Sequence, residues 1–276
     1  MKFRLIILAL ITSFLQAEAT VIPKPDFSAT SADALQSYLA TTNATVDENS
    51  WTTFIEKLAQ KKAKSKSEIQ FLRHVFTRTH QQYLKYFKTN TTFASLFENG
   101  SYNCLTGTIL YSTILHQFGI DHQVIETNYH IFILAQTNEG EVLIETTDPH
   151  EGFVTSSDKI AARINQYRNQ GVQSTDPTRS YFRYSFELYN EVSQNELIGL
   201  LYYNLAVDSF NQQSLQEAVH YLGRAIERYA SPRIEEFSEI LLLAVHESKL
   251  KEKDKILCKK ELQTIRYKAM VVMAGL

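Results

Sequence analysis

The chain has 276 residues, 44% of them hydrophobic, and a formal net charge of -2. This length and composition indicate one large or two small folded domains. Because neither basic nor acidic residues are in strong excess, the charge gives no support to wholesale binding of nucleic acid or of an anionic membrane surface.

The first residues, 1–19, are predicted to be a signal peptide. Lys2 and Arg4 precede an apolar run at 5–15 that is too short to span a bilayer, and Ala17-Glu-Ala19 fits the small-x-small cleavage pattern. An uncleaved N-terminal anchor is the alternative. No later stretch is long and apolar enough for a membrane helix, so we expect an exported protein, periplasmic or extracellular, without a membrane span after cleavage.

Residues 20–94 are expected to form the N-terminal helical part of the core. After a Ser/Thr/Ala-rich lead-in, a short helix is predicted at 32–39, and apolar residues at helical spacing predict helices at 51–64 and 67–88. His74 and His80 lie six residues apart, which is not the i, i+4 spacing of two metal ligands on one helix face. We therefore expect both at the surface or at the edge of the core.

Residues 95–180 are expected to hold an α+β core. A loop ends at Cys104, where an apolar helix begins, and Gly119 is placed to cap its C-terminus. Three strands are predicted next, at 122–127, 129–136 and 141–147, with a hairpin turn over 137–140. A helix followed by an antiparallel meander is an α+β arrangement.

The chain after this core is predicted to be mainly helical. A helix is expected at 158–167 and a linker or lid loop at 168–180, and the region 190–276 shows helices at 195–210, 215–229 and 235–250. This region resembles a tetratricopeptide repeat, whose small and apolar slots would be filled by Ala206, Leu215, Ala218, Leu222 and Ala225. One repeat must stack on the third helix or on the core to bury its apolar face, and the helices could bind a protein partner. A generic helical hairpin is the alternative.

Cys104 and His130 are candidates for a nucleophile and its base. At a helix start, unpaired N–H groups and the helix dipole favour the thiolate. His130 opens a strand on the face shared with Phe132, so a buried imidazole there needs a polar partner. His122 and His150 are weaker candidates for the base, and an unreactive cysteine with a structural histidine is the alternative.

Asp148 is the predicted group that orients the imidazole. The hairpin register sets His130 opposite Thr147, one residue from Asp148, and a bulge would bring the carboxylate to the ring. Glu145 is the second choice for this role. Asn103 or Tyr102 could donate to an oxyanion beside the backbone N–H of Cys104, and the sequence does not decide between them.

Residues 95–155 resemble the transglutaminase-like superfamily of papain-type folds. In that family a helix-start Cys is followed by a strand that begins with His and a strand that ends in Asp-Pro, here Cys104, His130 and Asp148-Pro149. The resemblance implies a papain/transglutaminase-like core, with the cysteine helix packed on an antiparallel sheet. It also implies a cysteine protease or amidase that works through these three residues, with no cofactor and no metal.

The sequence also departs from the family pattern around the expected site. The usual His-Ala-Trp is His130-Ile-Phe132, and the usual Pro-Ala-Arg after the helix is Asp121-His-Gln. These changes favour hydrolysis of an amide, as in a peptide or cell-wall peptide, over protein crosslinking.

Together these features predict an exported cysteine-dependent amide hydrolase or acyltransferase that forms a thioester, with a peptide or protein substrate. The alternative is a non-catalytic exported binding or scaffold protein that makes its contacts through the helical repeats. A disulfide between Cys104 and Cys258 is not favoured, because Cys258 lies in a predicted helix of a different region. A metal site is a weaker hypothesis, because the histidines lack ligand spacing.

Overall fold

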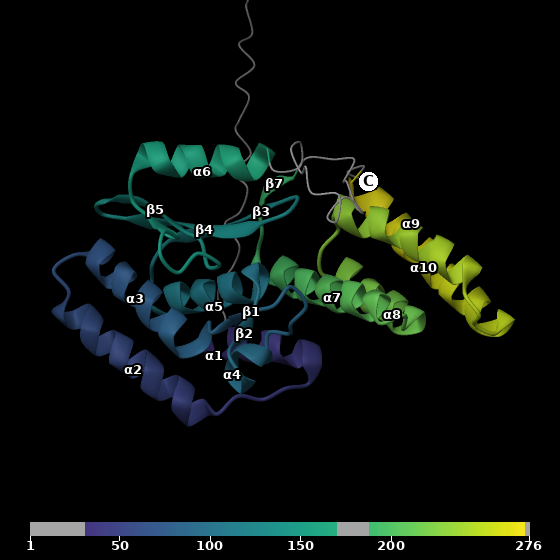
Figure 1. Cartoon of the computed structure of the whole chain (residues 1–276), viewed down its shortest axis with the longest axis horizontal. Helices are drawn as coiled ribbons and strands as arrows, with labels where there is room; N and C mark the ends of the chain where they lie inside the picture. Colours follow the sequence, from purple (N-terminus) through teal and green to yellow (C-terminus); the bar gives the residue numbers. More distant parts are fainter. Residues whose placement is uncertain (1–30, 170–187, 274–276) are drawn as a thin grey trace, which may run out of the picture.

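The computed structural model describes residues 31–169 and 188–273. The predicted signal peptide, the start of the lead-in and most of the predicted linker lie outside these ranges. The described chain has an α+β fold in which a five-stranded antiparallel sheet lies between helices and is followed by a group of C-terminal helices. In Figure 1, α6 (Ser157–Asn169) covers one face of the sheet and α5 (Cys104–Gln117) the other.

The N-terminal helices surround the far side of α5. The elements before the cysteine helix are α1 (Ser31–Leu39), η1 (Ala40–Thr42), α2 (Glu48–Lys64), α3 (Glu68–Tyr83), β1 (Tyr86–Phe87), α4 (Ser95–Glu98) and β2 (Ser101–Tyr102). The three predicted helices are present, and Asp47 and Ser67 cap α2 and α3. The helix predicted to run to 88 ends at Tyr83, because the chain leaves it to pair β1 with β2.

The sheet has the strand order β6-β5-β4-β3-β7. Its strands are β3 (His122–Thr127), β4 (Ile131–Thr137), β5 (Gly140–Ile144), β6 (Phe153–Val154) and β7 (Tyr189–Glu191). The hairpin register is the predicted one, with Thr137 opposite Gly140 and Ile133 opposite Ile144. Two details differ from prediction: β5 stops at Ile144, and β7 pairs with β3 where helix was expected from residue 190.

Alternate residues of β4 enter different cores, as the predicted strand pattern requires. Ile131 and Ile133 belong to the large core around α5, whereas Phe132 and Leu134 pack with Tyr167 and other residues under α6. The sheet is therefore buried on both faces.

Four helices follow the sheet within the described residues: α7 (Gln194–Asn211), α8 (Leu215–Ile226), α9 (Pro232–Glu247) and α10 (Glu252–Met273). Of the residues predicted for the small and apolar slots, Leu215 is partly buried, and the other four are fully buried: Ala206, Ala218, Leu222 and Ala225. Their small or tightly packed side chains bring α7 and α8 close together, and one core joins these helices to α9 and α10. The predicted hairpin is thus present and stacks on further helices.

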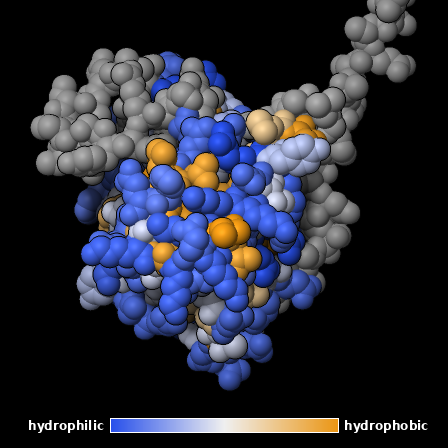
Figure 2. Space-filling view, turned by 90° about the vertical axis from the view of Figure 1, so that its right-hand side faces the viewer, coloured by the Kyte–Doolittle hydropathy of each residue, from blue (hydrophilic) through white to orange (hydrophobic). Residues whose placement is uncertain are grey.

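The outer surface of the C-terminal helices carries exposed apolar side chains. Figure 2 shows hydrophobic residues in orange among hydrophilic ones on this side of the molecule. The exposed large hydrophobic residues of α9 and α10 are Leu243, Ile256, Leu257, Tyr267 and Met270. Within 31–169 and 188–273, no helix combines the length and the apolar character needed to cross a bilayer.

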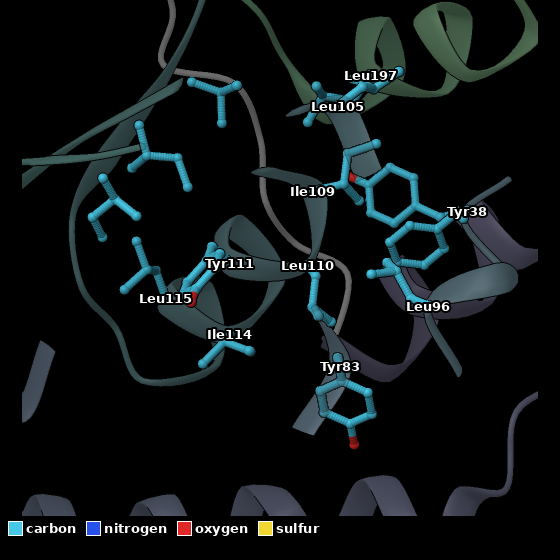
Figure 3. Packing of buried hydrophobic residues seen from close by; sticks show 14 of the residues in the cluster. Tyr38, Tyr83, Leu96, Leu105, Ile109, Leu110, Tyr111, Ile114, Leu115 and Leu197 are labelled. Carbon is cyan, nitrogen blue, oxygen red and sulfur yellow. The ribbon is translucent and has the colours of Figure 1, made fainter. Parts of the chain in front are cut away.

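Helix α5 is the centre of the larger core. Every residue from Leu105 to Leu115 is buried, as expected of a helix that is apolar on all sides. Figure 3 shows its side chains between those of α1, α4 and α7, with Ile109 near Tyr38 and Leu105 near Leu197. The first residue of α5 is consequently held in a rigid position.

Candidate functional site

Cys104 is the first residue of α5, as predicted. The preceding Asn103 caps the helix: its Oδ1 accepts from the N–H of Thr106 at 2.9 Å, and the Thr106 hydroxyl accepts from the Asn103 N–H at 3.0 Å. Such a capping box stabilises a helix start by about 1 kcal/mol. The Cys104 thiol is free and partly exposed, whereas Cys258 is free and buried. Cys104 therefore combines a fixed position with access to solvent.

The Asn103 side chain takes part in this cap and in a contact with a loop. Its amide nitrogen donates to the carbonyl of Thr89 at 3.0 Å. Of the two side chains considered for an oxyanion site, Asn103 is thereby committed to structure. The buried Tyr102 remains beside the site, and burial followed by the negative charge of Glu145 raises the pKa of its phenol.

His130 lies immediately before β4, next to the start of α5. The Thr108 hydroxyl, one helical turn after Cys104 on the same side of α5, donates to the carbonyl of Ile131 at 3.3 Å. This bond sets the N-terminal turn of α5 against the residue before Ile131. The His130 side chain lies within interaction range of the Cys104 thiol there, so the fold brings the two predicted residues together.

The third member of the cluster is Glu145. Its Oε2 accepts a hydrogen bond from Nε2 of His130 and another from the Tyr167 hydroxyl at 3.0 Å. Its Oε1 accepts from the backbone N–H and the hydroxyl of Thr147, at 2.8 and 2.7 Å. Glu145 is 2% exposed, so this carboxylate is desolvated but fully hydrogen-bonded. With Nε2 bound to Glu145, Nδ1 is the ring nitrogen left for the thiol.

Asp148 does not occupy the position predicted for it. Its Oδ1 accepts from the N–H groups of His150 and Glu151, at 3.2 and 2.8 Å, and its Oδ2 accepts from Arg163 at 3.3 Å. The carboxylate therefore closes the turn after β5 and ties it to α6.

The strand register explains this correction. Residues directly opposite each other in a hairpin share a face, and alternate residues change face. If the register continued, Asp148 would lie opposite Tyr129, on the face away from His130. Glu145 directly follows the last paired residue, Ile144, and by the same register would lie opposite Phe132, which shares its face with His130. Glu145, the second candidate from the sequence, is thus the residue that contacts the imidazole.

Charge favours an ionised cluster. Burial by itself lowers the pKa of His130, but its interactions with Cys104 and Glu145 outweigh burial and raise the pKa to about 10. Burial by itself raises the pKa of Glu145, but the hydrogen bond and charge of His130 and two bonds from Thr147 lower it. At neutral pH the imidazolium thus lies between the Glu145 carboxylate and the Cys104 side chain.

Tyr167 of α6 is a site residue that the sequence reasoning missed. Its ring packs on His130 with centroids 4.6 Å apart and on Phe132 at 5.1 Å, while its hydroxyl binds Glu145. Ile160, Ile164 and Tyr167 follow helical spacing, so the sequence could show that Tyr167 faces the core. The sequence could not show which residues of the sheet region the Tyr167 side chain contacts.

Two glycines allow the end of β5 to approach α5 and the turn to fold back. A Cβ on Gly107 would lie 2.8 Å from the Thr146 hydroxyl oxygen, and one on Gly152 would lie 2.1 Å from the Glu145 carbonyl oxygen. The Gly152 carbonyl also accepts from the Glu145 N–H at 2.7 Å. Both glycines are therefore needed for the observed path of residues 145–152.

His80 supports this region from α3. It is buried, not at the surface or core edge as expected, and its Nε2 donates to the Thr146 carbonyl at 3.0 Å. The Tyr111 hydroxyl lies 2.6 Å from its Nδ1. Burial lowers the pKa of His80, which keeps the ring neutral and able to accept there.

Comparison of the chain with protein-family models, curated proteins and solved structures finds no match. Among residues 31–169 and 188–273, no group of three or more His, Cys, Asp or Glu side chains is arranged to hold a metal ion.

Proposed function

We propose that the protein is an exported cysteine-dependent amide hydrolase or acyltransferase of transglutaminase-like type, with a triad of Cys104, His130 and Glu145. The observation that carries the proposal is that His130 interacts with the Cys104 thiol and also hydrogen-bonds through Nε2 to the Glu145 carboxylate. This order of groups is the one that nucleophilic catalysis by a thiol requires.

In the proposed reaction, the Cys104 thiolate attacks the carbonyl carbon of the substrate amide and forms a C–S bond. The oxyanion that develops lies near the first N–H groups of α5, which have no acceptor within the helix. The C–N bond then breaks, and the His130 imidazolium gives its proton to the leaving amine, which leaves a thioester.

The second half returns the enzyme to its starting state. Neutral His130 takes a proton from water or from an acceptor amine, whose oxygen or nitrogen attacks the thioester carbonyl. The C–S bond breaks, an acid or a new amide is released, and the thiolate faces the imidazolium again. Glu145 holds the ring and stabilises its positive charge in both halves.

Exposed aromatic side chains next to the triad support a peptide or protein substrate. Phe87 is 56% exposed and packs edge-to-face on Tyr102, two residues before Cys104. Tyr129, directly before His130, is 42% exposed. One of these side chains contacts a residue close to Cys104 and the other precedes His130, so both can offer apolar contact to residues that flank a scissile amide.

A thiol-directed probe tests the proposal. In a Cys258→Ser background, iodoacetamide should alkylate Cys104 of the folded protein at pH 6–7, and His130→Gln should slow the reaction by about 10²-fold or more. Cleavage of a peptide and peptidoglycan panel should disappear in Cys104→Ala. Equal alkylation in the wild-type and His130→Gln proteins would refute the triad.

A second candidate, a non-catalytic binding protein, is favoured by the exposed apolar residues of α9 and α10. The two proposals differ in what Cys104→Ala should do. It abolishes turnover of an enzyme, but it leaves the affinity of a scaffold for its partner unchanged, which calorimetry can measure with a candidate partner.

A further inference from the structure

Arg233, at the second position of α9, reaches from the helical region to the turn that carries His130. Its Nη2 donates to the carbonyls of Thr127 and Asn128, at 3.0 and 3.1 Å. Its Nε donates to Oε1 of Glu126 at 3.0 Å, and Tyr229 donates to Oε2 of the same carboxylate at 2.6 Å. One guanidinium therefore fixes three consecutive residues, 126–128.

Thr127, in the same turn, hydrogen-bonds to both the carbonyl and the N–H of His130. The Thr127 N–H donates to the His130 carbonyl at 2.8 Å, and the His130 N–H donates to the Thr127 hydroxyl at 3.1 Å. A movement of Thr127 consequently moves His130. The ring of His130 must in turn meet Cys104 and Glu145 together, and a misplacement of reacting groups by about 1 Å can cost on the order of 10²-fold in rate.

Burial makes the Arg233 contacts persistent. The side chains of Arg233 and Glu126 are 12% and 3% exposed, so water screens their ion pair only weakly. The Arg233 guanidinium also lies 5.6 Å from the ring centroid of Tyr203 on α7. The guanidinium is thus held by the helical region at one end and holds the 127–130 turn at the other.

The geometry points to Arg233 as a positioning residue for the Cys104–His130 pair, through which the C-terminal helical region sets the reactivity of the thiol. This inference rests on the proposed function, since the thiol is taken to act as a nucleophile. It gives the helices a role in the reaction that needs no contact with the substrate.

Only an arginine can make this set of bonds. A planar guanidinium donates in several fixed directions at once, whereas a lysine ammonium is a single point of charge. Arg233→Lys should keep the ion pair with Glu126 and lose at least one carbonyl contact. Arg233→Gln should lose the ion pair and most of the contacts to the turn.

The test measures two properties in the full chain with Cys258→Ser. One is the rate of Cys104 alkylation by iodoacetamide from pH 5 to 9, and the other is hydrogen exchange of the Thr127 and His130 amides. Arg233→Gln should exchange these amides about 10-fold faster and lower the alkylation rate at pH 6–7 about 10-fold, with the profile moved to higher pH. Arg233→Lys should give a smaller change of the same sign.

The matched control is Arg266→Gln. Arg266 of α10 pairs with Glu239 of α9 at 2.7 Å, so this change removes an arginine–carboxylate pair within the helical region that is not bonded to the turn. It should leave both the alkylation profile and the exchange of the two amides unchanged. If Arg233→Gln does not fold, the same two measurements on Arg233→Lys test the positioning role.

The outcomes separate the two proposals. A folded Arg233 variant with the wild-type alkylation profile, while His130→Gln alters that profile, overturns the positioning role and leaves the triad standing. A profile unaffected by His130→Gln overturns the triad, and the exchange of the turn amides then still shows whether Arg233 holds the turn.

Discussion

At the residue scale, the orientation of the His130 ring depends on which of two nearby carboxylates contacts it. Asp148 and Glu145 lie three residues apart, and both are held by hydrogen bonds, yet only Glu145 contacts the imidazole. The difference follows from the two-residue period of a strand, which places Glu145 on the face of His130. A residue one register position from the one that faces His130 can thus be further from the imidazole than a residue two positions away.

Matched substitutions of the two carboxylates test this assignment. Glu145→Gln should slow Cys104 alkylation at neutral pH, and any amide hydrolysis, by about 10²-fold or more, because the imidazolium loses its charged partner. Asp148→Asn removes a charge of the same sign nearby and should change either rate by less than about threefold. A larger effect of Asp148→Asn than of Glu145→Gln would show that Asp148 orients the imidazole.

The pH dependence of the Glu145 contribution has a definite sign. The pKa of Glu145 is lowered in the folded state, so its share of stability is present above its ordinary pKa and is lost as pH falls through the folded value. The pKa of His130 is raised to about 10, so its share is present below its ordinary value and is lost as pH rises towards 10. The difference in unfolding free energy between wild type and Glu145→Gln, from urea titrations, should therefore be largest near pH 5–7.

At the scale of elements, the site depends on how closely β5 and α5 approach. The N-terminal turn of α5 meets the end of β5 at Gly107, where the Thr146 side chain leaves no room for a Cβ. The helix, the strand and the turn at 148–152 are separately predictable, but their contact is not a property of any one of them. Because of this close contact, a substitution that favours helix formation can still disrupt the site.

Two glycines in helix interiors provide a matched pair for this point. Helix propensity alone favours Gly→Ala by about 0.5–1 kcal/mol at either position. Gly223→Ala in α8 would meet only the end of the Glu261 side chain, so it should be neutral or stabilising. Gly107→Ala should destabilise the protein in thermal unfolding and slow Cys104 alkylation, because it pushes Thr146 and the neighbouring Glu145 away. A stabilised Gly107→Ala protein with normal alkylation would contradict this account.

At the scale of the whole molecule, the core of the sheet region and the core of the C-terminal helices are joined through α7. Leu197, Leu200 and Leu201 pack in the first core, whereas Tyr203 and Ala206 of the same helix pack in the second. A helix that contributes to both cores couples their unfolding. The described chain should consequently unfold as one cooperative unit.

The single tryptophan allows a direct test of this coupling. Trp51 is buried in the first core, and Leu262 of α10 is fully buried in the second. Leu262→Ala should cost about 2–5 kcal/mol and lower the denaturant midpoint of Trp51 fluorescence together with that of far-UV circular dichroism. An unchanged Trp51 midpoint beside a two-step circular dichroism curve would show that the two parts unfold separately.

The sequence by itself determined the helical and strand periods, the helix start at Cys104 and the register of the 137–140 hairpin, because each depends on side chains within a few residues of one another. Those patterns bring a thiol and an imidazole to the ends of neighbouring elements. Only the tertiary structure decided that Glu145 and Tyr167 complete the cluster, that His80 is buried beside it and that Arg233 holds the turn of His130. These contacts join residues far apart in the chain, and packing between elements selects them, so no local pattern carries the information.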